Sequence, residues 1–520
     1  MISQSDQSQC VAATEETTVA PVPPRYWWLK RIALASAFLL AALVGLRLWW
    51  GWEANRRLQA EIDRIIAAGE PIYPEDFDPK EAIPDEQNAA RLLVEANEAV
   101  NLTSEQQGLL EEVVGNSKEQ VEEVRGIVEG NAEALTLVRR ARGLPTTDWD
   151  LRIRTPAIET SLPALSGHRQ LAKLMYLASW HRHVVGNDNE AIETVRDGLA
   201  QSRSISQFQT LIPQLVSWAS AGFAIRALEH ILPSLDITAK NKETSQGEGA
   251  ASQVQIRNLI AELLDERQMR EGMRRAMLAE RMMQVDIHNE LMRGKTTMSA
   301  LIGWQGPPPV QLPDVVWRYA LAPAITLSAT DVLRHTTLLV EAADSPSYSG
   351  SAAEGGPWET QVGLRFLRHP FRGYLTGAFD WTFELYFRLL SRRRLAATAL
   401  AIRLYEIDHG RRPELLSELV PVYLPRVPED PFTENGQTLR YFPDTTHPLV
   451  YSIGVDREDD GGRSDRQRRD GDITFFLDGW RPEDESDGAP RTSTQASEDD
   501  VDIDDEEGEG DEDDTGEEEP

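Results

Sequence analysis

The longest uninterrupted apolar stretch of the chain lies near the N-terminus, between two groups of tryptophans. Residues 32–46 carry no charge, and Arg47 at the far end can extend its guanidinium toward water. In a helix, Trp28 and Trp49 would lie about 31 Å apart, which matches a hydrocarbon layer of about 30 Å with aromatic rings at both interfaces. The pattern predicts one transmembrane helix over 26–52.

Two other interpretations of this stretch can be weighed from its flanks. A signal peptide is favoured by Arg25, Lys30 and Arg31, which precede the apolar run. Against it, the run begins far from Met1, and no small-x-small cleavage site follows it. A buried core helix would not concentrate tryptophans at its two ends. We therefore favour an uncleaved membrane anchor.

Basic residues near the two ends of this helix are almost equal in number, so the positive-inside rule gives a weak signal. Those before and after the span are Arg25, Lys30 and Arg31, and then Arg47, Arg56, Arg57 and Arg64. We expect the N-terminus inside, because only the short arm 1–25 has to stay there. The bulk of the chain would then lie outside the cytoplasmic membrane.

Helical periodicity continues beyond the anchor. Leu58, Ile62, Ile65 and Ile66 recur at helical spacing and form one apolar stripe, and Gly69 is a stop signal. The membrane helix is therefore expected to extend into the region that follows it.

The next block, 53–235, has helical patterns throughout. Asn187 and Asp188 form a turn signal between two helices, and this pair is weakly similar to one tetratricopeptide unit. No second copy is found, so a generic helical hairpin is favoured. After a polar linker at 236–251, one long helix is predicted from residue 252 to about 293, with a methionine stripe suited to packing against a neighbour.

The C-terminal part changes to a mixed pattern. A helix is predicted from about Trp381 to Gly410, where a glycine suits the left-handed position after a helix. Three short β-like runs follow, at 439–441, 449–453 and 474–477. A long helix covered by a small antiparallel sheet is an α+β arrangement.

The ordered short motifs of this module resemble the C-terminal domain of the major pseudopilin of type II secretion. The matching pieces are LYEIDHGRRPELLSELVPVYLPRVPEDPF, LRY, VYSIGVDREDDGG and GDI. The resemblance implies a secretion- or envelope-related role. In a pilin the apolar helix directly precedes this domain; here it lies far upstream, so polymerisation as a pilus subunit is not expected. The whole layout also resembles uncharacterised bacterial single-pass membrane-anchored proteins, which implies no known activity.

The same resemblance implies a calcium site in the loop 456–472. Its candidate carboxylate ligands are Asp456, Asp459, Asp460 and Asp472. Calcium takes several hard oxygen ligands and tolerates irregular loops, with backbone carbonyls completing the shell. The alternative is a solvated acidic loop, balanced by nearby arginines at positions 463, 466, 468 and 469.

Composition narrows the possible partners. The 520 residues are 41% hydrophobic, enough for two or three folded units, and carry a net charge of −32. Residues 483–520 hold twenty acids against Arg491 alone, and this tail is predicted to be disordered; a cation-binding or nucleic-acid-mimicking tail is the alternative. No basic domain compensates, so no nucleic-acid partner is expected. The single cysteine, Cys10, precludes an intramolecular disulfide.

No complete catalytic motif is found. The sequences H-E-x-x-H and G-x-S-x-G are missing, and the GKT at Gly294 lacks the first glycine and the preceding strand of a phosphate-binding loop. We therefore expect a non-catalytic, membrane-anchored assembly or scaffold protein, with the lipid bilayer and envelope proteins as partners. A calcium-responsive surface protein and a membrane-anchored enzyme of unknown class are the alternatives.

The predicted fold is mainly α, with a transmembrane helix, a helical block, a small pseudopilin-like α+β module and a disordered acidic tail. The predicted segments are the arm 1–25, the anchor 26–52, the helical block 53–235, the linker 236–251, the long-helix region 252–345, the connecting segment 346–380, the α+β module 381–480 and the tail 481–520.

Overall fold

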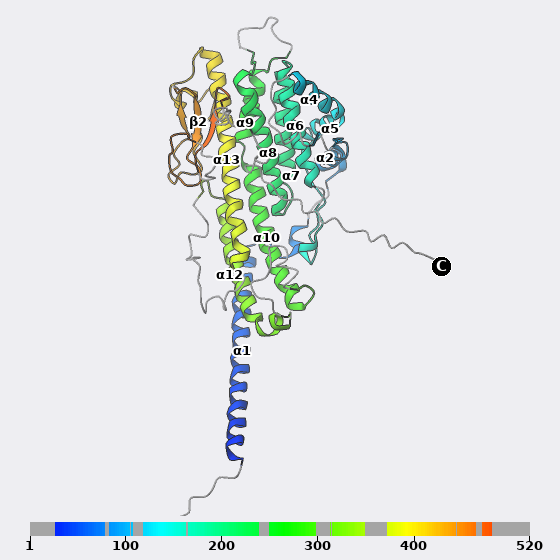
Figure 1. Cartoon of the computed structure of the whole chain (residues 1–520), viewed down its shortest axis with the longest axis vertical. Coiled ribbons are helices and arrows are strands. Elements are labelled where there is room, and N and C mark those ends of the chain that lie inside the picture. Colours follow the sequence, from blue (N-terminus) through cyan, green and yellow to red (C-terminus); the bar gives the residue numbers. More distant parts are fainter. Residues whose placement is uncertain are drawn as a thin grey trace, which may run out of the picture.

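The computed structural model confirms a mainly helical protein with an N-terminal apolar helix and one small sheet (Figure 1). It describes residues 26–78, 83–103, 106–107, 118–162, 165–238, 249–297, 313, 315–348, 372–443, 445–463 and 471–480. The predicted disordered arm and acidic tail lie outside the described residues.

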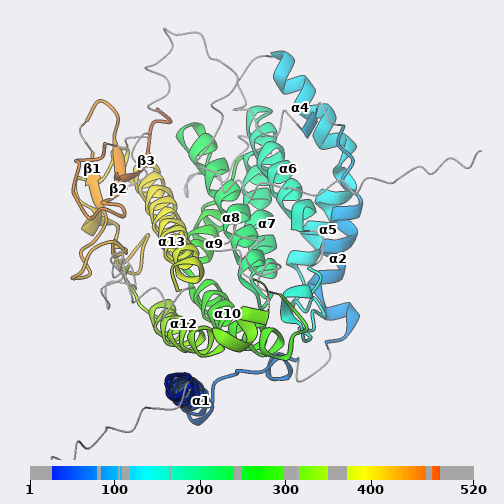
Figure 2. The same ribbon diagram turned by 60° about the horizontal axis from the view of Figure 1, so that its bottom comes forward.

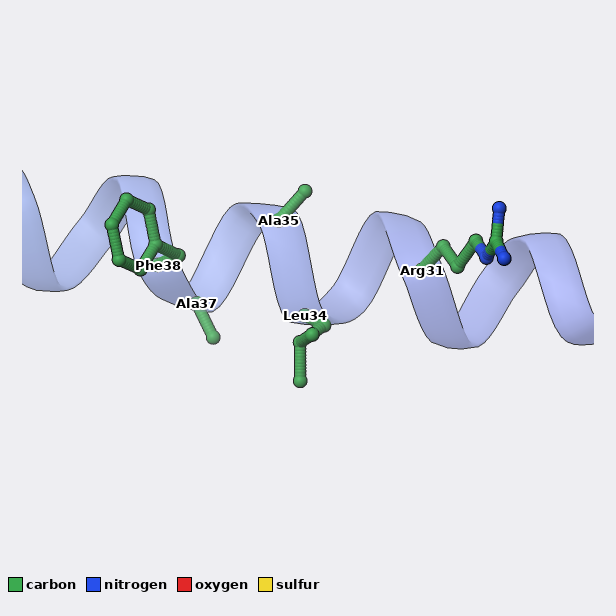
Figure 3. Close-up of a pocket in the computed structure, with 5 residues that line it drawn as sticks. All are labelled: Arg31, Leu34, Ala35, Ala37 and Phe38. Carbon is green, nitrogen blue, oxygen red and sulfur yellow. The ribbon is translucent and has the colours of Figure 1, made fainter.

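Helix α1, Trp27–Ala67, is the stalk of the molecule in Figure 1. Its apolar part is long enough to cross a membrane and is not buried by any other described part of the chain. Figure 3 shows side chains of this part, from Arg31 to Phe38, projecting from a single helix with no element opposite them. Arg47 does not extend toward water as expected: its guanidinium donates to the backbone carbonyls of Tyr319 and Ala320.

The second half of α1 belongs to the body of the protein. Leu58, Ile62 and Ile65 are buried against Val285 and Leu333, which confirms the predicted continuation of the helix. The fourth residue of the predicted stripe, Ile66, is instead 48% exposed. The helix stops before Gly69, which has a φ of +74°, a conformation that favours glycine.

The body is built on an antiparallel helical core. Its first helices are α2 Ala89–Glu98, α4 Lys118–Gly130, α5 Ala132–Arg142, α6 Leu165–Val184, α7 Asp188–Ile205 and α8 Leu211–Ile231. The α6–α7 pair is the predicted hairpin, turning at Gly186 with a φ of +79° and capped by the Asn187 side chain. Helix α8, extended by the η4 turn to Ser234, is also apolar enough to span a membrane, but 72% of its apolar window is buried in the body, as expected of a core helix.

Short turns of helix connect these elements. They are η1 Pro74–Phe77, η2 Asp85–Gln87, η3 Ala157–Glu159, η4 Leu232–Ser234 and η7 Leu416–Leu419, together with the π-helical turn η5 Val316–Ala320.

The predicted long helix after the linker is two helices, α9 Gln253–Leu264 and α10 Arg267–Arg293. The prediction of one continuous helix was wrong. The chain turns at Asp265, whose side chain accepts from the Arg267 amide, and Arg393 of a distant helix binds the carbonyls of Glu262, Leu263 and Asp265 at this junction. The methionine stripe of α10 is buried, in agreement with its predicted packing role. Helix α12, Ala322–Ala343, lies between α10 and α1 (Figure 2).

Helix α13, Arg372–His409, connects the helical body to the sheet. It begins before the predicted Trp381 and ends, as predicted, at Gly410, whose φ is +69°. The strands are β1 Arg440–Phe442, β2 Leu449–Ser452 and β3 Ile473–Phe476, antiparallel in the order β1-β2-β3. All three lie within one residue of the predicted runs. One continuous core includes residues from α2 through β3, so the sheet module and the helical body share their interior.

Candidate functional site

The predicted calcium ligands lie in the loop that joins the central strand β2 to the edge strand β3. The tight turn at Gly462 shapes this loop, because its φ is +77° and an added Cβ would lie 2.6 Å from Leu449 Cδ1. The positive φ favours glycine at this position, and a larger residue would also have to displace the end of the Leu449 side chain. The Gly462 amide then donates to Asp472 Oδ2 at 2.7 Å.

Asp472 has the most unusual environment of the four predicted ligands. It is only 3% exposed, and its Oδ1 atom is buried without a hydrogen-bond partner in the described part of the chain. Burial raises the pKa of Asp472 to about 6, although the backbone amides of Gly462 and Asp460 act in the opposite direction; the negative charges of Asp459 and Asp460 add to the rise. A buried carboxylate oxygen with no donor is costly, and a bound cation would remove that cost.

Asp459 is already paired. Its Oδ2 accepts from Arg440 Nε at 2.7 Å, and its Oδ1 accepts from the Tyr451 hydroxyl and the Gly461 amide, both at 3.1 Å. Burial raises the pKa of Asp459, but these donors outweigh that effect and leave the pKa below its ordinary value. A cation at this carboxylate would have to compete with Arg440.

Asp456 and Asp460 are exposed, and Asp456 Oδ1 accepts from the Glu458 amide at 3.1 Å within its own turn. Within the described residues, no three His, Cys, Asp or Glu side chains are placed to hold a metal ion together. The four predicted ligands are thus on one loop without converging. Calcium binding stays a prediction, and it rests on Asp472 with backbone carbonyls more than on the whole set.

Sequence reasoning missed the carboxylate that organises this region, Asp430. It is 1% exposed, and its Oδ1 accepts from the Phe432 amide at 3.0 Å and the Ser452 hydroxyl at 2.7 Å. Its Oδ2 accepts from the Ile453 amide at 3.0 Å and from Arg440 Nη1 at 3.3 Å. Asp430 therefore ties the loop before the sheet to strand β2. The only sequence signal was its Asp-Pro step, which is typical of a turn.

Two adjacent arginines of α13 were also missed. Arg393 is 3% exposed and donates to three backbone carbonyls at the end of α9. Arg394 makes a two-pronged ion pair with Glu266, at 2.7 and 2.9 Å, and donates to the Glu429 carbonyl at 2.8 Å. Together they join α13 to the α9–α10 junction and to the loop that holds Asp430.

His183, Gly294 and Lys295 have structural roles. His183 contacts Asp188 at 2.5 Å and Ser234 Oγ at 2.9 Å, so it joins the end of α6 to the start of α7 and to the η4 turn. Gly294 of the GKT sequence ends helix α10 with a φ of +74°. Lys295 lies 3.4 Å from the Glu290 carboxylate.

A buried histidine in the helical block is expected to make the protein sensitive to acid. His168 is 1% exposed and packs edge-on against Trp149, and burial lowers its pKa to about 4. The unfolded chain takes up this proton near pH 6.5, whereas the native protein does so only near pH 4. The free energy of unfolding should therefore be highest above pH 6.5 and should fall by about 3 kcal/mol as the pH is lowered from 6.5 to 4.

The measurement is the melting temperature across this pH range for the wild type and for His168→Gln, which cannot titrate. His447→Gln, at a half-exposed position, is the matched control. We expect a shallower pH dependence in His168→Gln alone; equal slopes for all three proteins would contradict the assignment.

No family model, curated protein or solved structure matches this chain.

Proposed function

We propose that this protein is a single-pass, membrane-anchored, non-catalytic assembly or scaffold protein of the cell envelope. In this proposal it displays the helical body and the pseudopilin-like sheet outside the cytoplasmic membrane to protein partners. The observation that carries the proposal is the continuity of α1, which is one 41-residue helix from the candidate membrane span into the body.

The junction between anchor and body is tightly fixed. Besides the apolar contacts of Leu58, Ile62 and Ile65, α1 contributes Glu61, which is only 7% exposed. Its carboxylate lies 2.6 Å from Arg64 and 3.3 Å from Arg334 of α12. A charge pair at the packed interface between α1 and α12 favours one register of the two helices. Such a junction fixes the body relative to α1 and so holds it at a set height above the membrane, which suits a scaffold.

Surfaces for a protein partner are available on the sheet module. Leu415 and Val422 are 66% and 57% exposed, beside the short turn η7. Large apolar side chains exposed in one region are typical of contact sites. Crosslinking from an unnatural photoreactive residue at Leu415, in native membranes, tests this: a discrete adduct is expected there, and none from the equally exposed Val254 on α9 if the surface is specific.

For orientation, we propose that the N-terminal arm stays in the cytoplasm. Support comes from Arg25, Lys30 and Arg31 at that end and from the shortness of the arm. The opposite orientation also has an observation in its favour. The fold brings Arg293, Lys295 and Arg318 close to the body-side end of the span, where they add to the basic residues that follow it in sequence.

The single native cysteine makes orientation directly measurable. Cys10 lies in the N-terminal arm, so a membrane-impermeant maleimide should label it only after cells are permeabilised. In a Cys10→Ser, Leu415→Cys variant, the exposed body site should label in intact cells. The reverse pattern would place the body in the cytoplasm. Loss of the protein from membranes in alkaline carbonate would reject the anchor itself.

Calcium responsiveness is the second candidate function, favoured by the unpartnered buried Oδ1 of Asp472. A ligand that binds only the native state stabilises it by about 2.7 kcal/mol at a hundred times its dissociation constant. Calcium should therefore raise the melting temperature of the wild type relative to a chelator. Asp472→Asn should abolish that shift, while Asp85→Asn, at an exposed acid elsewhere, should retain it. An equal melting temperature of the wild type with calcium and with chelator would reject the site.

A further inference from the structure

The lower end of the body is formed where α10 ends and α12 begins, beside the membrane part of α1 (Figures 1 and 2). We refer to Arg293–Lys295 together with Val315–Ala320 as the membrane-proximal tip. We propose that this tip rests on the bilayer, with its apolar side chains in the boundary between headgroups and acyl chains and its cations on anionic lipid phosphates. The inference rests on the proposed function, because it requires α1 to span the membrane.

The depth of the tip follows from its contacts with α1. Arg47 donates to the carbonyls of Tyr319 and Ala320, so these residues lie at the height of the last turns of the apolar span. One turn higher, a Cβ on Gly51 would lie 3.9 Å from Pro323 in the first turn of α12. The flanking Trp49 and Trp52 are 59% and 62% exposed at the same level. Tryptophan at this level is typical of the membrane–water interface.

The surface of the tip has the composition that such a position requires. Val315 and Tyr319 are 66% and 68% exposed, although both are large and one is wholly apolar. Exposing these apolar surfaces to water is unfavourable. At the acyl boundary the valine side chain would be buried, and the tyrosine ring would be buried with its hydroxyl among the headgroups. The tip is therefore continuous with the lipid-facing surface of α1.

The charges of the tip are mainly positive. Arg293 and Lys295 have side chains that are 60% and 62% exposed, and both share the buried carboxylate of Glu290, at 2.9 and 3.4 Å. Arg318 packs its guanidinium against Gly294, where an added Cβ would collide with it. Among the described residues, these three cations and Arg47 lie near the carboxylate of Glu290. Cations near a membrane surface attract anionic headgroups.

This contact would give the body two points of attachment, the helix and the tip. A single helix fixes height but allows the body to tilt on the bilayer. A second contact beside it, on the α10–α12 side, would hold the long axis of the body at one angle. The partner-binding surfaces of the sheet module would then be presented at a constant distance from the membrane.

The test uses the full-length chain in lipid nanodiscs, with Cys10→Ser removing the only native cysteine. Single cysteines carrying a nitroxide replace Val315 or Tyr319. Phe38, 77% exposed in the span, is the lipid control, and Leu415, 66% exposed on the sheet module, is the water control. Collision with oxygen, which concentrates in lipid, is compared with collision with a nickel chelate, which stays in water.

We expect the oxygen-to-nickel ratio at positions 315 and 319 to exceed that at 415 several-fold and to fall below that at 38. Ratios at 315 and 319 equal to that at 415, with position 38 still in lipid, would overturn the inference and leave the proposed function standing. A water-like ratio at position 38 would overturn both.

The interaction of the tip's cations with anionic lipid is measured separately. In discs with phosphatidylglycerol, the ratio at position 319 should be higher than in discs of phosphatidylcholine alone. Lys295→Gln, which keeps Arg293 paired with Glu290, should reduce that difference. A ratio that is the same in both lipids would overturn the assignment of anionic headgroups to the tip.

Discussion

Replacing Arg393 with methionine is expected to lower the free energy of unfolding by roughly 3 kcal/mol or more. The guanidinium is buried and donates to the carbonyls of Leu263, Glu262 and Asp265 at 2.8 to 3.0 Å. Methionine fills similar volume but donates nothing, so three carbonyls at the end of α9 lose their partner in the interior. Each buried polar group left unsatisfied costs about 1–3 kcal/mol.

The adjacent Arg392 provides a matched control, because it lies on the same helix with its side chain exposed. Arg392→Met should change the melting temperature of the full-length protein in detergent very little. Arg393→Lys should recover only part of the loss, since an ammonium cannot reproduce the planar fork that reaches three carbonyls. The melting temperatures are measured by far-ultraviolet circular dichroism. Equal values for Arg392→Met and Arg393→Met would show that the stability of the junction does not depend on the Arg393 side chain.

The elements that the sequence predicted well are those specified by neighbouring residues. The long apolar helix near the N-terminus follows from an uncharged run with tryptophans at both ends, and the α6–α7 hairpin follows from a turn at Gly186 and Asn187. The end of α13 at Gly410 and the three strands follow from local signals of the same kind. In each case the pattern and the physical cause lie within a few residues of each other.

The features that could not be predicted depend on distant partners. The break between α9 and α10 lies inside a helical pattern, and its free carbonyls are bound by Arg393, 128 residues beyond Asp265. Arg47 was expected to reach water, but the turn that accepts its hydrogen bonds is 272 and 273 residues away. No period or spacing along the chain reports such pairings.

The candidate calcium loop illustrates the same limit. The resemblance implied four carboxylate ligands on one loop, and the structure places all four on the loop between β2 and β3. Spacing could not reveal that Arg440, on strand β1, pairs with Asp459, or that Asp472 is buried with one oxygen unpartnered. It could not single out Asp430 either, because the donors that define its role come from β2 and the residue after it.

Replacing Asp430 with alanine is expected to have the second large effect, a loss of about 3 kcal/mol centred on the sheet module. The substitution leaves the buried amides of Phe432 and Ile453 without their acceptor. Asp430→Asn should lose less stability, because the asparagine oxygen can replace one of the two carboxylate oxygens. Its NH₂ group then faces the hydrogen-bond donors that the second carboxylate oxygen accepted from.

Hydrogen exchange separates this local effect from general destabilisation. In Asp430→Ala, the amides of Phe432 and Ile453 should exchange much faster, while those of the α6–α7 hairpin change less. Asp460→Ala, which removes an exposed carboxylate from the same region, is the control and should leave all of them protected. Because the module and the helical body share one core, a strong effect at β2 should also reach the neighbouring turns of α13, which contact β2 and β3. Unchanged protection at Ile453 would mean that the sheet is held by its apolar contacts alone, and that Asp430 does not link the loop that precedes the sheet to strand β2.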